Sequence, residues 1–278
     1  MSFESIKKFH SPAAPLEIDC GWIGARLLPA APYSVCQRSP RSVFGIALAR
    51  QAGVHAIGGE RRRDFAAWPG EWAYAAPEVE IFSESMAGGE YLALHVARDA
   101  AEAMPRSGDA APRRGGRGDR QAVLLAWGLR RLLLAERPDP GRVEQTAALL
   151  LARGLALLAQ PRRGSGRYPS DRVIHARVLD HIDAALGDPL GLDALAALAG
   201  MPPLRFLRSF TGAVGVTPHA YITERRVRRA RDLLSASDLT LAAIAADCGF
   251  AHQSHLGAAF HARLGLSPGR YRALRGAR

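Results

Sequence analysis

The chain of 278 residues is long enough for two ordinary domains, and because 48% of its residues are hydrophobic we expect it to be mostly folded. Its formal net charge of +11 favours a polyanionic partner, either nucleic acid or an anionic membrane surface. Three widely spaced cysteines exclude a disulfide framework, and the lack of a signal-peptide core or membrane-spanning run predicts a cytoplasmic protein.

Short β-prone runs fill the first hundred residues. VEIFSES (79–85) and EYLALHV (90–96) alternate in part between apolar and polar residues and lie close together. Turn signals separate such runs at Gly58-Gly59, Pro69-Gly70 and Gly88-Gly89. Several short strands at this spacing predict a β-sandwich or barrel, which we assign to residues 1–104.

The middle of the chain alternates basic linkers with apolar helices. Residues 105–119 and 161–171 are rich in Gly, Pro and Arg and are expected to be linkers. Residues 120–160 are dense in Ala and Leu and are expected to form a helical hairpin, broken at RPDPG (137–141). Two interpretations fit its leucines, packing within the chain and a homodimer interface.

The last part of the chain, residues 172–278, is helical in pattern and contains a loose internal repeat. The copies are residues 190–221 and 239–271, and each has a short Ala/Leu helix, a glycine and a longer helix that includes phenylalanine. Each copy closes with Thr/Ser-Pro followed by a tyrosine. The fold class is therefore expected to be α+β, with an N-terminal β domain and a C-terminal all-α domain.

Each copy has the layout of a DNA-binding helix-turn-helix. Gly249, at the corner of the second copy, can adopt the left-handed conformation that ends the first helix. Leu241, Ile244 and Ala245 give the first helix of this copy an apolar face, and Leu256 and Phe260, four residues apart, are expected to pack inward from the second. The equivalent residues of the first copy are Leu195, Leu198, Gly200, Phe206 and Phe210. The second helices are expected near residues 203–213 and 252–263.

A continuous helix is expected between the copies, in PHAYITERRVRRARDLLSASD (218–238), with its arginines on a largely solvated face. A helix of about eighteen residues is roughly 27 Å long. That length could hold the two second helices about one DNA turn apart, which is roughly 34 Å. Both would then enter successive major grooves, and a single chain would read a bipartite site.

Cysteine and histidine gather in the second copy, as Cys248, His252, His255 and His261. A structural zinc site usually takes four ligands at set spacing, and here the one cysteine lies at the turn, where a small apolar residue is wanted. In the N-terminal region a metal triad would have to come from His55, His95, Glu78, Glu80 and Glu90, which include no HxH pair. We therefore expect no metal, no cofactor and no catalytic residue.

Aromatic residues of the N-terminal region are expected to be ordinary barrel core rather than a ligand cavity. They are Trp22, Trp68, Trp72, Tyr74 and Phe82. The sequence therefore names no ligand-binding residue.

The polar faces of the two second helices carry the candidate DNA contacts. Arg205 and Arg208 lie opposite the phenylalanines and are expected to reach guanine edges or phosphates. Gln253 and Ser254 suit adenine or phosphate, with capping or packing as the alternative for Ser254. The full set is Leu204, Arg205, Arg208, Thr211, His252, Gln253, Ser254, His255 and His261.

Residues 174–275 closely resemble the AraC/XylS family of bacterial transcriptional regulators. The motifs that carry the resemblance are LAALAG, FLRSF, GVTPHAYITERRVRRARDLL, AAIAADCGF, the frame of Ser254 and Phe260, and LGLSPGRYR. More loosely, IGGERRRDFAAW and PGEWAYAAPEVEIFSES look like the cupin-like sensor half of many members. The helices at 120–160 lie where such members place connecting or dimerising helices.

The resemblance implies a two-domain regulator, not an enzyme, that binds double-stranded promoter DNA at the bacterial nucleoid. It further implies RNA polymerase as a partner and, in many members, a small-molecule effector. It implies no membrane partner.

The second copy departs from the family pattern. His252 replaces a common aspartate, Leu256 an aromatic residue, Ala258 an arginine and His261 a lysine or arginine. Gly257 also weakens this helix by up to about 1 kcal/mol relative to alanine. We therefore hypothesise that the first copy supplies most of the sequence readout.

Two other classes of function remain open. A cupin-type metalloenzyme with a helical tail would need metal ligands. A protein that coats DNA through charge alone would show no preference for a promoter over bulk DNA.

Overall fold

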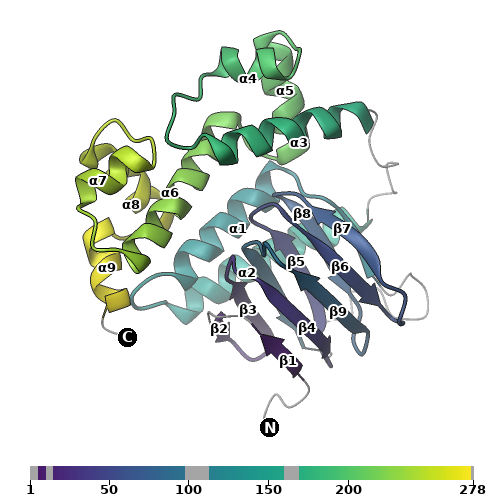
Figure 1. Ribbon diagram of the computed structural model, residues 1–278. Coiled ribbons are helices and arrows are strands. Elements are labelled where there is room, and N and C mark those ends of the chain that lie inside the picture. The colour runs from purple at the N-terminus through teal and green to yellow at the C-terminus, as the bar shows by residue number, and fades with distance from the viewer. Residues whose placement is uncertain (1–5, 11–14, 98–112, 160–168, 277–278) are drawn as a thin grey trace. The chain divides into compact units, whose positions relative to one another are not determined.

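A computed structural model describes residues 6–10, 15–97, 113–159 and 169–276 of the chain (Figure 1). The chain divides into two compact units, the first formed by residues 1–134 and 138–161 and the second by residues 135–137 and 162–278.

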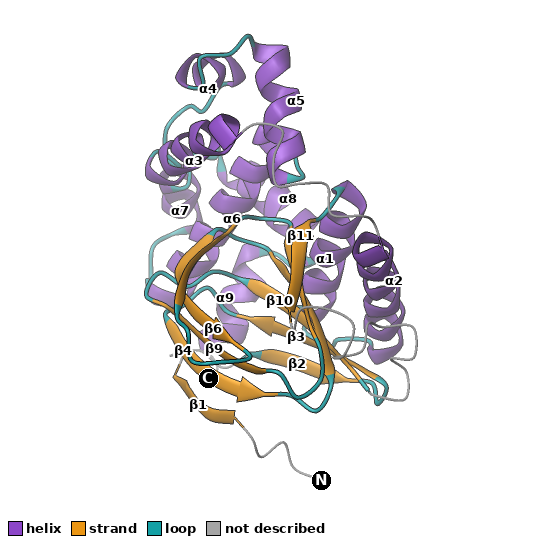
Figure 2. Ribbon diagram, turned by 90° about the vertical axis from the view of Figure 1, so that its right-hand side faces the viewer, coloured by secondary structure: helices purple, strands orange, loops and turns teal. Residues whose placement is uncertain are grey.

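The described strands of the first unit form two antiparallel sheets that make an open sandwich rather than a closed barrel (Figure 2). The first sheet has the order β1-β4-β9-β6-β7 and the second β11-β8-β5-β10-β3-β2. The strands are β1 (Ile6–His10), β2 (Leu16–Asp19), β3 (Ile23–Leu28), β4 (Tyr33–Arg38), β5 (Ser42–Ala47), β6 (Gln51–Ile57), β7 (Arg63–Ala67), β8 (Glu71–Ala75), β9 (Glu80–Ser85), β10 (Tyr91–Val96) and β11 (Arg113–Arg117). The β-sandwich that the sequence predicts is confirmed.

Two helices, α1 (Arg120–Leu133) and α2 (Pro140–Ala159), pack against the second sheet (Figure 2). The main apolar core of the first unit lies between these two helices and the second sheet. Strand β10 shows how this core is built. Leu92, Leu94 and Val96 belong to this core, and the residues between them point to the other face of the sheet. The Leu-rich helices therefore complete the β unit, and Leu129, Leu150 and Leu151 are buried within it.

Part of the stretch expected to be a linker, 105–119, is a strand instead. Arg113–Arg117 form β11, which pairs with β8 from Arg113↔Ala75 to Arg117↔Glu71. A Cβ atom on Gly115 would lie 3.0 Å from the backbone oxygen of Trp72, and one on Gly116 would lie 3.1 Å from its ring. In the sequence these glycines suggest a flexible linker, but in the structure they allow β11 to pair closely with β8 beside Trp72.

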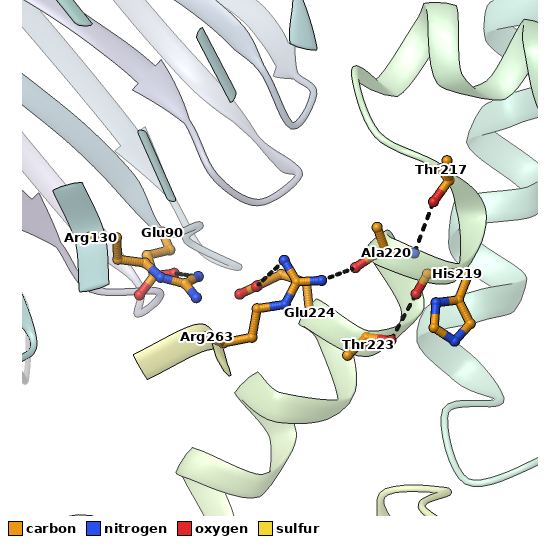
Figure 3. Close-up of polar contacts among 8 residues, drawn as sticks. All are labelled: Glu90, Arg130, Thr217, His219, Ala220, Thr223, Glu224 and Arg263. Carbon is orange, nitrogen blue, oxygen red and sulfur yellow. Dashed lines mark hydrogen bonds and ion pairs between the residues drawn. The ribbon is translucent and has the colours of Figure 1, made fainter. Parts of the chain in front are cut away.

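A buried ion pair joins α1 to the start of β10. Arg130 Nη1 lies 3.0 Å from Glu90 Oε2, and the side chains are 1% and 5% exposed (Figure 3). The backbone oxygen of Glu90 also accepts hydrogen bonds from Leu48 and Ala49. Glu90, one of the carboxylates considered as a metal ligand, is therefore part of the structural framework.

The second unit is helical in its described residues. Its helices are α3 (Pro169–Ala184), α4 (Leu192–Leu198), α5 (Pro203–Val214), α6 (Pro218–Ala236), α7 (Leu241–Asp247), α8 (Gln253–Leu264) and α9 (Pro268–Gly276). Figure 1 shows α6 lying between the α4–α5 pair and α7–α9. The predicted all-α domain with two repeats joined by a helix is confirmed.

Candidate nucleic-acid interface

The two helix pairs, which we call the first head (α4 and α5) and the second head (α7 and α8), turn in the same way. Gly200 has φ of 64° and Gly249 has φ of 75°, so both take the left-handed conformation that the sequence predicts. The amide of the next residue donates to an oxygen five residues back in each case, from Met201 to Ala196 at 3.0 Å and from Phe250 to Ala245 at 2.8 Å. The internal repeat is therefore a repeat of backbone geometry.

Apolar side chains fill the inner side of each head. Phe206 and Phe210 of α5, and Leu256 and Phe260 of α8, have no exposed surface. Leu195, Ile244, Ala245 and Phe250 are also buried. Leu198 is 38% exposed, so the prediction that it packs inward is wrong.

The outer face of α5 carries three of the four contacts expected there. Leu204, Arg205 and Arg208 are exposed, Leu204 by 68%. Thr211 is half-buried, and its hydroxyl oxygen is shielded from solvent and makes no hydrogen bond. In this conformation the hydroxyl of Thr211 is therefore not available for a polar contact at the surface.

The first turn of α8 is organised by a histidine. His252 is the N-cap rather than the first helical residue, and its Nδ1 accepts the backbone N–H of His255 at 3.1 Å. The hydroxyl of Ser254 lies 2.7 Å from the same nitrogen. His252, Gln253, Ser254 and His255 are exposed, as is His261 further along the helix.

Cys248 does not join these histidines in a metal site. Its side chain has no exposed surface, and burial followed by the charge of Asp247 raises the pKa of its thiol to about 12. It therefore packs as a protonated, small apolar side chain at the corner of the second head. Over the ranges described by the structure, no group of three or more His, Cys, Asp or Glu side chains is arranged to hold a metal ion.

The arginines of α6 do not form the largely solvated face that the sequence suggested. Arg225 donates to Asp183 of α3 at 2.6 Å, and Arg229 donates to Asp247 of α7 at 2.9 Å. Arg226 donates to the backbone oxygens of Leu186 and Asp188 at 3.0 and 2.8 Å, which satisfies oxygens beyond the end of α3. These side chains fix α3 and the second head to α6.

The arginine of α8 is also turned toward α6. Arg263 donates to the backbone oxygen of Ala220 at 3.3 Å and lies 3.8 Å from the carboxylate of Glu224 (Figure 3). Arg263 is the one arginine in Gln253–Leu264, which contains no lysine. The outer face of α8 therefore presents histidine and neutral polar groups rather than arginine.

A buried histidine supports the first head from α3. His175 has no exposed surface, and its Nε2 lies 2.8 Å from the hydroxyl of Ser209 on α5. Its ring also lies against the rings of Phe206 and Phe210, at centroid distances of 6.0 and 5.7 Å. Sequence reasoning missed His175, because a single histidine in a helix carries no signal of the helix that it will face.

Helix α6 thus carries two heads of the same geometry, each with an exposed polar face on its second helix. This arrangement defines a double helix-turn-helix DNA-binding domain.

Comparison with known proteins gives the same class. Residues 195–274 match a family model described as a helix-turn-helix domain. HTH-type transcriptional regulator GlxA of Rhizobium meliloti is 31% identical over 142 residues, which are 50% of this chain and 44% of that protein. HTH-type transcriptional regulator Rv1931c of Mycobacterium tuberculosis is 40% identical over 78 residues, 28% of this chain and 30% of that protein. The second unit therefore contains an AraC-type helix-turn-helix domain.

Two solved structures are similar to part of the chain. The DNA-binding domain of AdpA in complex with a target DNA is 33% identical, covers 37% of this chain and 94% of that one, and has a TM-score of 0.37. An AraC-type transcriptional regulator from Chromobacterium violaceum is 25% identical, covers 39% and 96%, and has a TM-score of 0.36.

The chain spans about half or less of the length of the curated relatives that it matches. For Probable transcriptional regulator LumQ of Photobacterium leiognathi the matched share is 49% of that protein and 46% of this chain, at 26% identity. Within the described residues, no helix is both long enough and apolar enough to cross a membrane.

Proposed function

We propose that the chain is a sequence-specific transcriptional regulator whose helices α5 and α8 enter successive major grooves of promoter DNA. The observation that supports this most is the pair of heads with matching turns on one helix, each with its second helix exposed on the polar side. Helix α6 has 19 residues and is therefore roughly 28 Å long, close to one DNA turn of roughly 34 Å.

The two heads contribute unequally to this proposed readout. Helix α5 presents Arg205 and Arg208, which can contact guanine edges or phosphates. Helix α8 presents His255 and Gln253, while its arginine, Arg263, contacts α6. We expect the first head to supply most of the sequence preference and the second to position the protein.

Competition binding tests the function. A labelled promoter fragment, found by mapping the binding sites of the protein across its genome, is challenged with bulk DNA at one fixed salt concentration. A specific regulator is expected to prefer its promoter by a factor on the order of a thousand or more, whereas a DNA-coating protein shows no preference. Equal competition by bulk DNA would falsify the proposal.

Single substitutions test the division of labour between the heads. Arg208→Ala is expected to lower promoter affinity by about 1–3 kcal/mol, because a guanine or phosphate contact is lost, and Gln253→Ala by less. Arg177→Ala is the matched control, since it removes an exposed arginine of α3 outside both heads. Unchanged affinity for Arg208→Ala together with lost binding for Gln253→Ala and His255→Ala would contradict the proposed asymmetry.

Further partners follow from this proposal. A promoter-bound regulator of this type acts with RNA polymerase. It would act in the bacterial cytoplasm, where the chromosome lies. We also propose that a small-molecule effector acts through the first unit, and that the chain forms a homodimer through α1 and α2.

A further inference from the structure

The two sheets of the first unit enclose a cavity of about 200 Å³. It lies on the face of the second sheet that is turned away from α1 and α2. Along β10, Tyr91, Ala93 and His95 line the cavity, whereas Leu92 and Leu94 belong to the core beneath the helices. The helices thus supply the main apolar core, and the interior of the sandwich stays hollow.

Polar side chains from both sheets face this cavity. Tyr33, His55 and Ser83 contribute from the first sheet, with the tyrosine hydroxyl 3.1 Å from the serine hydroxyl. Arg113 of β11 reaches across from the second sheet, and its Nη1 lies 3.3 Å from Nδ1 of His55. Because arginine is always a donor, His55 must be the acceptor, so its ring is neutral there.

The charge in the cavity is incompletely balanced. Among the described residues Arg113 has no carboxylate partner, and its hydrogen-bond partner is the neutral ring of His55. Glu71 is the one carboxylate that the described residues contribute to the cavity wall, and it accepts the backbone N–H of Trp68 at 3.1 Å. Arg26, the other cation of the wall, lies 3.4 Å from Glu17. A guanidinium that faces a cavity and has no carboxylate partner is a ready partner for an anion.

Both histidines of the cavity wall have a lowered pKa. Burial, followed by the charges of Arg113 and Arg63, lowers the pKa of His55. Burial, followed by the charges of Arg26 and Arg41, lowers the pKa of His95 to about 4, against the opposing charge of Asp19. Neither histidine therefore carries a positive charge at neutral pH, and the arginines remain the cations that an entering anion would meet.

The size of the cavity sets the size of its occupant. An engineered cavity of about 150 Å³ in another protein binds benzene, so about 200 Å³ accommodates one ring with a short substituent. Most of the remaining wall is apolar, including Val35, Phe65 and Ala93.

We propose that the cavity between the two sheets binds a small organic carboxylate, with its charged group paired to Arg113 and its apolar body between the sheets. This inference deepens the proposed response to an effector, and it rests on that proposed function for its regulatory meaning. Gln51, which is 7% exposed, has a side-chain oxygen that makes no hydrogen bond and lines the same cavity, so it offers an acceptor to a ligand that also carries a donor.

Binding to the full chain without DNA tests the proposal. The probes are phenylacetate, cyclohexanecarboxylate and hexanoate, each compared with its neutral amide by calorimetry and by the shift in unfolding temperature. At least one carboxylate is expected to bind saturably and about tenfold or more tighter than its amide, because only the charged form pairs with the guanidinium. No saturable binding by any of the three, or equal binding of the amides, overturns the proposal.

Three variants locate the site. Arg113→Gln is expected to weaken carboxylate binding about tenfold or more. Ala93→Phe is expected to abolish it by filling the cavity with the charge intact. Arg61→Gln, which removes an exposed arginine outside the cavity wall, is expected to leave it unchanged. Binding that persists in Arg113→Gln overturns the proposal.

The unfolding temperature without ligand distinguishes an Arg113 that anchors a ligand from an Arg113 that has only a structural role. In Arg113→Met an uncompensated charge beside the cavity is replaced by an apolar side chain, so the unfolding temperature is expected to equal or exceed that of the wild type. An arginine that merely holds β11 in place predicts a lower unfolding temperature with carboxylate binding retained, and that result overturns the proposal. All of these measurements omit DNA, so they are independent of the promoter competition.

Discussion

Histidine is an uncommon N-cap, because only its neutral ring has a nitrogen free to accept a hydrogen bond. In the second head this nitrogen, Nδ1 of His252, accepts the N–H of His255 and lies close to the hydroxyl of Ser254. The cap therefore replaces the aspartate common in the resembled family with a side chain that has no negative charge. A neutral cap leaves the end of α8 that we propose to face DNA free of a repelling carboxylate.

Substitution of His252 is expected to separate capping from DNA binding. His252→Ala should lower the free energy of unfolding of the second unit by about 1 kcal/mol, because the side-chain acceptor of the first turn is lost. His252→Asp should restore that stability, through the cap and the helix dipole, yet weaken DNA binding by charge repulsion. Chemical denaturation and DNA titration measure the two effects.

Thr240→Ala is the matched control for His252. Thr240 caps α7 by accepting from Ala243 at 3.2 Å, so its loss should cost similar stability without adding or removing a group on α8. Full stability of His252→Ala would show that the observed cap contributes nothing.

At the scale of elements, charged side chains join helices to their supports in both units. In the first unit Arg130 and Glu90 connect α1 with the second sheet. In the second unit Arg225 and Arg229 connect α6 with α3 and α7. How much such an ion pair contributes to the free energy of unfolding depends on its burial. Removal of one partner of a buried pair leaves the other charge unpaired and out of contact with water.

Two ion pairs of nearly equal length allow this dependence to be measured. Glu90→Gln is expected to lower the free energy of unfolding by about 3–5 kcal/mol, because the Arg130 guanidinium stays buried without its carboxylate. The exposed pair Arg38–Glu80 has a separation of 3.1 Å against 3.0 Å, with side chains 56% and 55% exposed. Glu80→Gln is therefore expected to cost less than about 1 kcal/mol.

Denaturant unfolding of the full chain measures both losses. The double substitution of Glu90→Leu with Arg130→Met should recover most of the stability, since no buried charge is then left unpaired. Equal losses for Glu90→Gln and Glu80→Gln would mean that burial does not control the strength of these pairs.

At the scale of the whole molecule, α1 and α2 use their leucines in two ways. One face is buried against the second sheet, which accounts for packing within the chain. Leu124 and Leu149 remain 50% and 54% exposed. These two side chains are where a homodimer interface of this hairpin would gain apolar contact.

The double variant Leu124→Glu with Leu149→Glu is expected to convert a dimer of the full chain to a monomer, because charges replace apolar side chains at the interface. Analytical ultracentrifugation over a range of protein concentrations measures the change. Leu239→Glu is the control, since Leu239 is an exposed leucine of the second unit, 44% exposed. A wild-type chain that stays monomeric over the whole range would contradict the proposed dimer.

The sequence by itself determined the two heads. Their turns depend on Gly200 and Gly249, and their inner faces on pairs of large apolar residues four positions apart, so spacing along a few turns of chain is sufficient to predict them. The α5 and α8 boundaries lie within one residue of the expected helix limits, because capping and propensity act locally. The exposed positions of Arg205 and Arg208 follow from the same periodicity.

Only the tertiary structure decided which distant groups meet. The pairing of β11 with β8, the contact of Arg113 with His55 and the contact of Arg263 with α6 join residues about 40 or more positions apart. Such pairs leave no periodic signal in the sequence, since their spacing depends on how sheets and helices pack. For the same reason β10 alone could not indicate that one of its faces covers the core and the other lines a cavity.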